Sequence, residues 1–102
     1  MAFQGAIMIS AEDSIAVCLE DFSEGAEIEV RLGEESWNVK ASEAIPFGFK
    51  IALKDIAAGE HILKYGESIG VASETIPMGG LVHVHNLEGG KGRGDLEMRD
   101  AR

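Results

Sequence analysis

The chain has 102 residues, of which 45% are hydrophobic and 26% are charged, a composition typical of one globular domain rather than of a disordered chain. Eighteen acidic and nine basic side chains give a formal net charge of −9. Because so acidic a chain repels phosphate backbones and anionic lipids, we expect neither a nucleic-acid nor a membrane partner. Residues 1–45 hold ten acidic and two basic side chains, so an anionic small molecule is expected to bind the second half of the chain.

The single cysteine, Cys18, can form neither an internal disulfide nor a cysteine-based zinc site. The N-terminal residues lack the basic start and apolar run of a signal peptide, and no apolar stretch reaches the roughly 18–20 residues of a membrane span. We therefore expect a cytoplasmic protein in which Cys18 is an inert core residue.

The apolar runs are short and separated by turn residues, which predicts strands rather than long helices. Two strands are expected at 5–9 and 14–19. The clearest pattern follows over 26–40, where Ile28 and its even-numbered neighbours alternate with charged residues. A turn at Gly33 then returns the chain along a second strand, so this segment is expected to form a β-hairpin.

The second half of the chain follows the same plan. Residues 54–59 are expected to form one helical or 3₁₀ turn, and 75–80 a loop rich in Pro and Gly. The pieces 55–60 and 75–80 resemble each other, which we interpret as similar turn chemistry rather than as a repeat. Further strands are predicted at 50–53, 61–65, 69–72 and 81–86.

These elements predict a small all-β domain over residues 1–88. Residues 89–102 contain glycines among charges and few apolar anchors, so a flexible, extended tail is expected there. Period-2 alternation predicts a core made of Ile28, Val30, Trp37, Val39, Ile51, Leu53, Ile62, Val82 and Val84.

Two histidines are the strongest candidates for chemistry. His83 and His85 flank Val84 in the predicted strand 81–86. Residues i and i+2 of a strand point to the same face, so the two imidazoles are expected to lie together, away from Val82 and Val84. Such a pair could share a metal ion or bind one carboxylate. The plainer alternative is two solvated histidines on an edge strand.

The other polar candidates have weaker signals. Lys50 follows an apolar stretch and could reach an anion, although a solvated lysine is the alternative. His61 is expected to be structural, and Tyr65 to pack. No phosphate-binding loop, dinucleotide fingerprint or Ser-His-Asp arrangement is present, so these function classes are not supported.

Four ordered motifs give the chain a family resemblance. From residue 45 onward it resembles the SAF domain of altronate and galactarate dehydratases. The likeness covers about residues 10–96. The motifs are Ile-Pro-Phe-Gly-Phe-Lys and the residues after it (45–59), the Lys-Tyr-Gly-Glu segment (62–70), Val-His-Val-His-Asn-Leu (82–87) and Gly-Arg-Gly-Asp-Leu (92–96).

The resemblance implies a β-clip fold and a role beside a larger dehydratase-like catalytic subunit. In this family the larger module eliminates water from sugar acids, with a divalent metal (iron or manganese). A related two-subunit enzyme eliminates sulfite from sulfolactate and has a small subunit of this size. By this resemblance His83 and His85 are candidate catalytic residues and metal ligands, and Lys50 a candidate for holding the substrate carboxylate. A homo-oligomer stays open.

One residue departs from the family pattern. Members usually have histidine in a Gly-His-Lys sequence, where this chain has Phe49 between Gly48 and Lys50. A phenyl ring has neither of the two imidazole nitrogens, so Phe49 can neither bind a metal nor transfer a proton. Two hypotheses follow: a subunit of a hydro-lyase, or a non-catalytic binding or assembly module. A sulfolactate sulfo-lyase small subunit is a further alternative.

Overall fold

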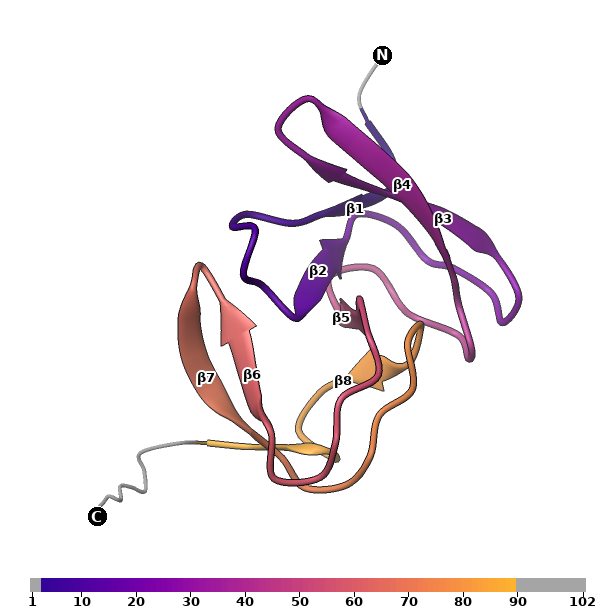
Figure 1. Cartoon of the computed structure of the whole chain (residues 1–102). Helices are drawn as coiled ribbons and strands as arrows, with labels where there is room; N and C mark the ends of the chain where they lie inside the picture. Colours follow the sequence, from indigo (N-terminus) through magenta and orange to yellow (C-terminus); the bar gives the residue numbers. More distant parts are fainter. Residues whose placement is uncertain (1–2, 90–102) are drawn as a thin grey trace.

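The computed structural model describes residues 3–89, which form nine strands and contain no helix (Figure 1). The prediction of an all-β domain is confirmed, and no helix in these residues could cross a membrane. The tail expected over 89–102 lies outside the described residues from 90 onward. The strands are β1 (Ala6–Ile7), β2 (Ile15–Cys18), β3 (Glu27–Leu32), β4 (Glu35–Lys40), β5 (Lys50–Ala52), β6 (His61–Lys64), β7 (Glu67–Ala72), β8 (Leu81–Val82) and β9 (Leu87–Glu88).

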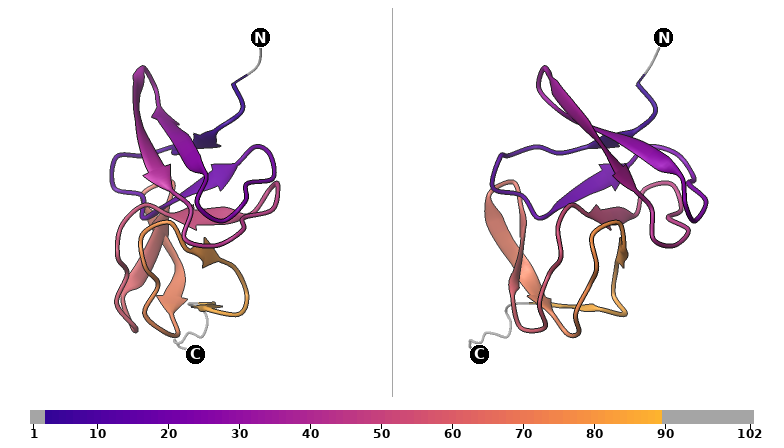
Figure 2. Two further views of the ribbon diagram at one scale, coloured as in Figure 1. Left: turned by 90° about the vertical axis from the view of Figure 1, so that its right-hand side faces the viewer. Right: turned by 45° about the vertical axis from the view of Figure 1, so that its right-hand side comes forward.

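The strands form two sheets. The larger sheet has the order β4-β3-β1-β2-β5-β8, with β1 and β3 parallel and the other neighbours antiparallel. The smaller sheet has the order β6-β7-β9 and is antiparallel throughout. The hairpin of β3 and β4, predicted from alternation, lies at one end of the molecule, and β6 and β7 lie toward the other (Figures 1 and 2).

Two hydrophobic cores lie on opposite faces of the central strands. Within β5, Ile51 belongs to the first core and Ala52 to the second, because successive residues of a strand point to opposite faces. Strand β2 divides in the same way, with Cys18 in the first core and Ile15 in the second. This position explains why β2 reads as a continuous apolar run while β3 alternates.

The predicted core is confirmed at six positions and corrected at two. Ile28, Val30, Val39, Ile51, Ile62 and Val82 are buried. Leu53 is half-buried against the first core. Trp37 is 38% exposed because its strand, β4, is the outermost of the larger sheet and has a neighbour on one side only. Val84 is 80% exposed because it lies in a turn.

The helical turn expected over 54–59 is wrong. Residues 57–60 form a β-turn, in which the Glu60 N–H donates to the Ala57 carbonyl at 2.9 Å. The same turn occurs at 23–26, 46–49 and 77–80, each closed by an equivalent hydrogen bond. Glycine is its third residue, at φ of +88°, +85°, +86° and +89° in chain order. Glycine adopts such angles without the steric cost of a Cβ atom, so the likeness of 55–60 to 75–80 is one of turn chemistry, as interpreted.

Candidate functional site

The segment that contains the two histidines is a strand only at its start. Strand β8 ends at Val82, and residues 83–86 form a turn in which the Asn86 N–H donates to the His83 carbonyl at 3.1 Å. The predicted strand over 81–86 is therefore wrong beyond Val82. The expectation that His83 and His85 share one strand face is therefore also wrong, because side chains do not alternate between two faces in a turn.

Asn86 holds this turn from within the protein. Its side chain is buried; its Oδ1 accepts the His83 N–H at 3.0 Å, and its Nδ2 donates to the Leu81 carbonyl at 2.8 Å. The Asn86 carbonyl also accepts the Ser73 N–H at 3.0 Å. A buried amide whose groups are paired in this way fixes the backbone around it. Asn86 therefore acts as the anchor that positions His83.

His83 contacts Phe49. The pairing of Lys50 with Val82 continues by one step beyond both strands, and this step brings Phe49 opposite His83. The two ring centroids are 4.3 Å apart with an interplanar angle of 38°. Both side chains are half-buried, and Phe49 also packs against the first core. His83 is thus a partly exposed imidazole held in place on one side by a phenyl ring.

The remaining histidines lie apart from this pair. His85 is exposed in the turn. His61 is exposed on β6, with its Nδ1 2.8 Å from Ser68 Oγ, in keeping with a structural role. Across residues 3–89, no three side chains of His, Cys, Asp or Glu gather closely enough to hold a metal ion. The described donors do not form a metal site by themselves.

Lys50 lies on the other face of β5 from Phe49. Phe49 and Ile51 pack on the first core, so the residue between them points toward the face of the second core. Lys50 is half-buried, and no carboxylate of residues 3–89 lies within ion-pair distance of it. Burial, and to a lesser extent the charge of Lys64, lower the pKa of the Lys50 ammonium. A partly desolvated cation without a counter-ion is suited to an anionic ligand.

Replacing this cation by an apolar side chain is expected to stabilise the isolated chain. Lys50→Met should raise Tm at pH 7, because it removes a half-buried charge that Lys64 repels. The parent's free energy of unfolding should rise relative to the variant's as pH climbs from the lowered folded pKa toward about 10.4. In that window the unfolded chain binds more protons than the folded one. Thermal unfolding of both proteins against pH measures this difference.

Lys54→Met is the matched control for that substitution. Lys54 is more exposed and pairs with Glu60 at 2.6 Å, so its loss should not raise Tm. If Lys50→Met lowers Tm at neutral pH by as much as Lys54→Met does, then Lys50 stabilises the fold. The interpretation of Lys50 as an unpaired cation suited to a ligand would then be wrong.

Two further predicted positions are placed by the structure. Cys18 is buried and fully enclosed, and burial raises the pKa of its thiol to about 11, so the prediction of an inert core cysteine is confirmed. Tyr65 is 61% exposed, at φ +59°, so the expectation that it packs is wrong. Its ring lies instead beside Lys64, whose Nζ is 5.1 Å from the ring centroid.

The sequence does not predict the contact between Phe49 and His83, although it contains two features that point to it. The family resemblance already marked the position of Phe49, and strands 50–53 and 81–86 were already expected. Only the register of these two strands, with Lys50 opposite Val82, shows that the marked position lies beside His83 rather than His85. A histidine in place of Phe49 would put an imidazole next to that of His83.

The described residues thus form a small all-β domain of short strands that carries a histidine turn. The chain belongs to the family described as the altronate/galactarate dehydratase SAF domain, which matches residues 4–90. This match runs through the turn 83–86, Lys50 and Phe49, so the whole candidate site lies within the family's domain.

Relatives of two kinds share this domain. Altronate dehydratase from Escherichia coli K12 is 41% identical over 80 residues, which make up 78% of this chain and 15% of the relative. The (2R)-sulfolactate sulfo-lyase subunit alpha from Chromohalobacter salexigens is 29% identical over 85 residues, 80% of this chain and 90% of the relative. The chain thus spans about 15% of the length of the dehydratases it matches, and nearly the full length of the subunit.

Proposed function

We propose that this chain is the SAF-domain part of a carbon–oxygen hydro-lyase, which assists a larger dehydratase-like chain in eliminating water from a sugar acid. The observation that carries the proposal is the family match over residues 4–90. The relatives support a larger partner, because the domain is either a small part of a dehydratase or a subunit designated alpha. A cytoplasmic location belongs to the same proposal.

Elimination of water from a 2,3-dihydroxy acid has three requirements. A base must take the proton next to the carboxylate, positive charge must stabilise the enediolate, and an acid must protonate the leaving hydroxyl. In the proposal His83 transfers a proton, since it is a partly exposed imidazole in a fixed position. In the proposal His85, which lies in the same turn, is a second candidate for transferring a proton.

Lys50 takes a separate part in the proposal. It lies on the opposite face of β5 from the Phe49–His83 pair, so one small acid does not contact both residues directly. In the proposal His83 is the group nearest the reacting carbons. In the proposal Lys50 binds a carboxylate group at a second, separate position.

The divalent metal that the family resemblance implies, iron or manganese, does not fit the described donors. Two imidazoles without a third ligand bind such an ion weakly, and Phe49 supplies no nitrogen. We therefore propose that the larger chain supplies most of the ligands of any such metal, and that His83 and His85 contribute at most part of the set.

Two other functions have observations in their favour. Phe49, in place of the usual family histidine, favours a non-catalytic binding or assembly module. The length of the sulfolactate sulfo-lyase subunit alpha, 90% of which is matched, favours a small subunit that acts on a sulfonated hydroxy acid. The assay below includes both kinds of substrate and distinguishes these alternatives.

The test is to reconstitute the chain with the larger dehydratase-like chain of the same organism and to assay altronate, galactarate and sulfolactate. His83→Ala should lower kcat/KM by about 100-fold or more, the usual contribution of a general acid or base. His61→Ala is the control, because His61 lies in β6 and contacts Ser68 rather than Phe49.

The outcomes of the assay separate the functions. Loss of turnover in His83→Ala with unchanged assembly supports the hydro-lyase role. If His83→Ala and His85→Ala both assemble and turn over like the parent, the catalytic assignment is wrong. Turnover that does not depend on this chain at all would leave the assembly module as its function.

A further inference from the structure

Strand β4 is the one long, regular open edge among the sheet edges of residues 3–89. The edge strands β8 and β9 have two residues each. Strand β6 is interrupted by a bulge at Ile62 and Leu63, and Ser14 hydrogen-bonds to Leu63 through both its N–H and its side chain. β4 instead pairs with β3 over six unbroken steps and is open on its other side (Figure 1).

The backbone of β4 presents unpaired groups along this open side. The Ala41 N–H donates to the Ala26 carbonyl at 2.8 Å, and hydrogen-bonded pairs alternate along an antiparallel ladder. Val39, Trp37 and Glu35 therefore bond inward to β3, and Ser36, Asn38 and Lys40 direct their N–H and C=O groups outward. The opening ends at Lys40, because Gly79 lies against the Lys40 carbonyl oxygen and the Ser42 N–H donates to the Gly79 carbonyl at 3.0 Å.

Natural sheets usually protect such an edge with proline, a bulge, a very short strand or charged side chains. β4 contains no proline and no bulge, and its two charged side chains, Glu35 and Lys40, stand at its two ends. Trp37, in mid-strand, is a large aromatic side chain that is 38% exposed. A partly exposed tryptophan on an open edge is typical of a surface that another strand completes.

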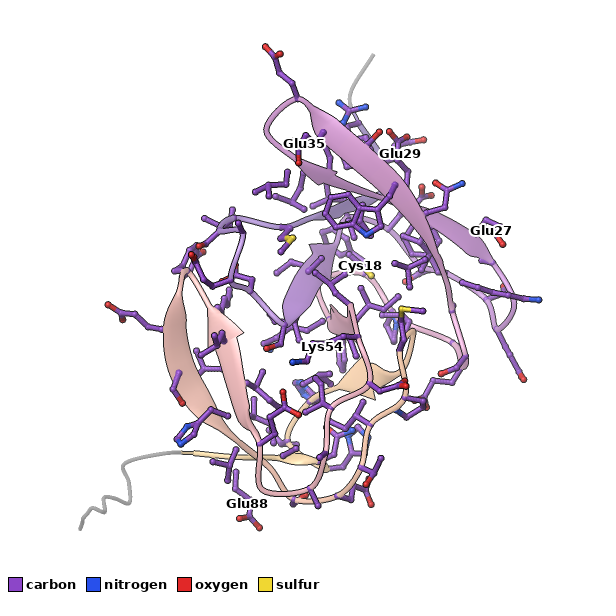
Figure 3. All side chains as sticks on the ribbon, in the orientation of Figure 1. Cys18, Glu27, Glu29, Glu35, Lys54 and Glu88 are labelled. Atoms are coloured by element: carbon purple, nitrogen blue, oxygen red, sulfur yellow. The ribbon has the colours of Figure 1, made fainter. Side chains whose placement is uncertain are left out.

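The charges around β4 indicate what kind of strand fits. Glu27, Glu29 and Glu35 all extend from the hairpin (Figure 3). Residues 27–40 hold four acidic and two basic side chains, and Arg31 pairs with Glu29 at 3.4 Å, so the hairpin carries a net charge of −2. A second copy would bring a surface of the same sign against this one, and like charges oppose such pairing. A strand with basic side chains and an apolar residue against Trp37 is complementary to it.

We propose that a basic β-strand of the larger catalytic chain adds to β4 and extends the six-stranded sheet by one strand. The proposal rests on the proposed function, because that function supplies the larger chain. The added strand bonds to the outward groups of Ser36 and Asn38 and covers Trp37. This contact lies on the first half of the chain, away from His83, so docking and chemistry use different surfaces.

The decisive variant is Asn38→Pro. Proline removes the outward N–H of Asn38, which makes no bond to β3, and its ring obstructs an incoming strand. The hairpin should therefore persist while docking is lost. Asn38→Thr is the matched control, since it changes the side chain and keeps the N–H. Binding to the larger chain of the same organism is measured by isothermal titration, and Asn38→Pro should weaken it at least tenfold while Asn38→Thr stays within about twofold.

A second readout reports on the edge directly. Trp37 is the only tryptophan of the chain, so 5-fluorotryptophan labels this edge alone. Its ¹⁹F resonance should shift when the unlabelled larger chain is added to the parent, and should not shift with Asn38→Pro. The free variant must first show the parent's circular dichroism spectrum, which establishes that the hairpin is intact.

Each outcome decides the proposal. Equal binding by the parent and by a folded Asn38→Pro overturns it, and leaves the proposed function standing. The proposal is also overturned if the parent chain forms a dimer by itself and Asn38→Pro prevents that dimer. The strand added to β4 would then come from a second copy of this chain. If the parent binds no larger chain, both proposals fail. A His83→Ala variant that loses turnover but binds like the parent supports the proposal, because docking then does not use the histidine turn.

Discussion

Gly79→Ala is expected to lower the free energy of unfolding by more than about 3 kcal/mol. Gly79 has φ +89°, and a Cβ atom built on it would lie 2.1 Å from the Lys40 carbonyl oxygen. That oxygen belongs to the backbone of β4 and cannot swing aside. The turn at 77–80 would have to move, which would strain the Gly79 N–H bond to the Ala52 carbonyl and the Ser42 N–H bond to the Gly79 carbonyl.

Gly48→Ala is the matched control for this prediction. Gly48 occupies the same position of an equivalent turn at φ +85°, but a Cβ atom there meets nothing within 4 Å. Its substitution should cost only the conformational penalty, about 1–2 kcal/mol. Urea unfolding of both variants measures the difference. Equal losses in the two variants would show that the close approach to Lys40 is relieved without cost.

Asp13→Ala is expected to cost about 2–4 kcal/mol, because it removes a buried acceptor from a contact between distant segments. The Asp13 carboxylate accepts the Gly66 N–H at 2.8 Å and the Ser10 N–H at 3.1 Å. It thereby ties the loop before β2 to the turn between β6 and β7. Glu12→Ala is the control, since Glu12 is exposed and does not bond to that turn. Comparable losses in chemical denaturation would contradict the assignment.

The pH dependence of stability tests the same contact. Burial by itself would raise the pKa of the Asp13 carboxyl, but the surrounding N–H donors, that of Gly66 first, outweigh burial and hold the pKa below its usual value. The contribution of Asp13 is thus fully present above about pH 3.9 and is lost as pH falls through the lower folded pKa. The stability gap between parent and Asp13→Ala should narrow below pH 4. A gap that stays constant to pH 2 would contradict this sign.

Strands of the larger sheet can be predicted from the sequence when one face of the strand is buried and the other is exposed to solvent. In β3, Ile28 and Val30 alternate with charged residues, and Gly33 supplies the turn that returns the chain along β4. These signals are local, since side-chain direction in a strand has period 2. The burial of Trp37 was mispredicted, because alternation reports which face a residue occupies and not whether the sheet continues beyond its strand.

The candidate site was predictable in its residues and not in its geometry. His83, His85 and Lys50 were visible as unusual polar residues, and their catalytic, metal-binding and substrate-binding roles remain predictions. The turn at 83–86 depends on Asn86, whose bonds reach Leu81 and Ser73. No local pattern distinguishes a buried, hydrogen-bonded asparagine from a solvated one, so the apolar alternation of Val82 and Val84 predicts a longer strand than the structure shows.

Residue type and short-range periodicity are enough to predict the class of fold, the hairpin, most of the core and the family resemblance. Three features appear only in the folded protein: Phe49 lies against His83, Lys50 points to the opposite face, and β4 is an open edge. These features follow from the register and order of strands far apart in the chain. Register is set by packing across the sheets, and this information is not contained in any single segment.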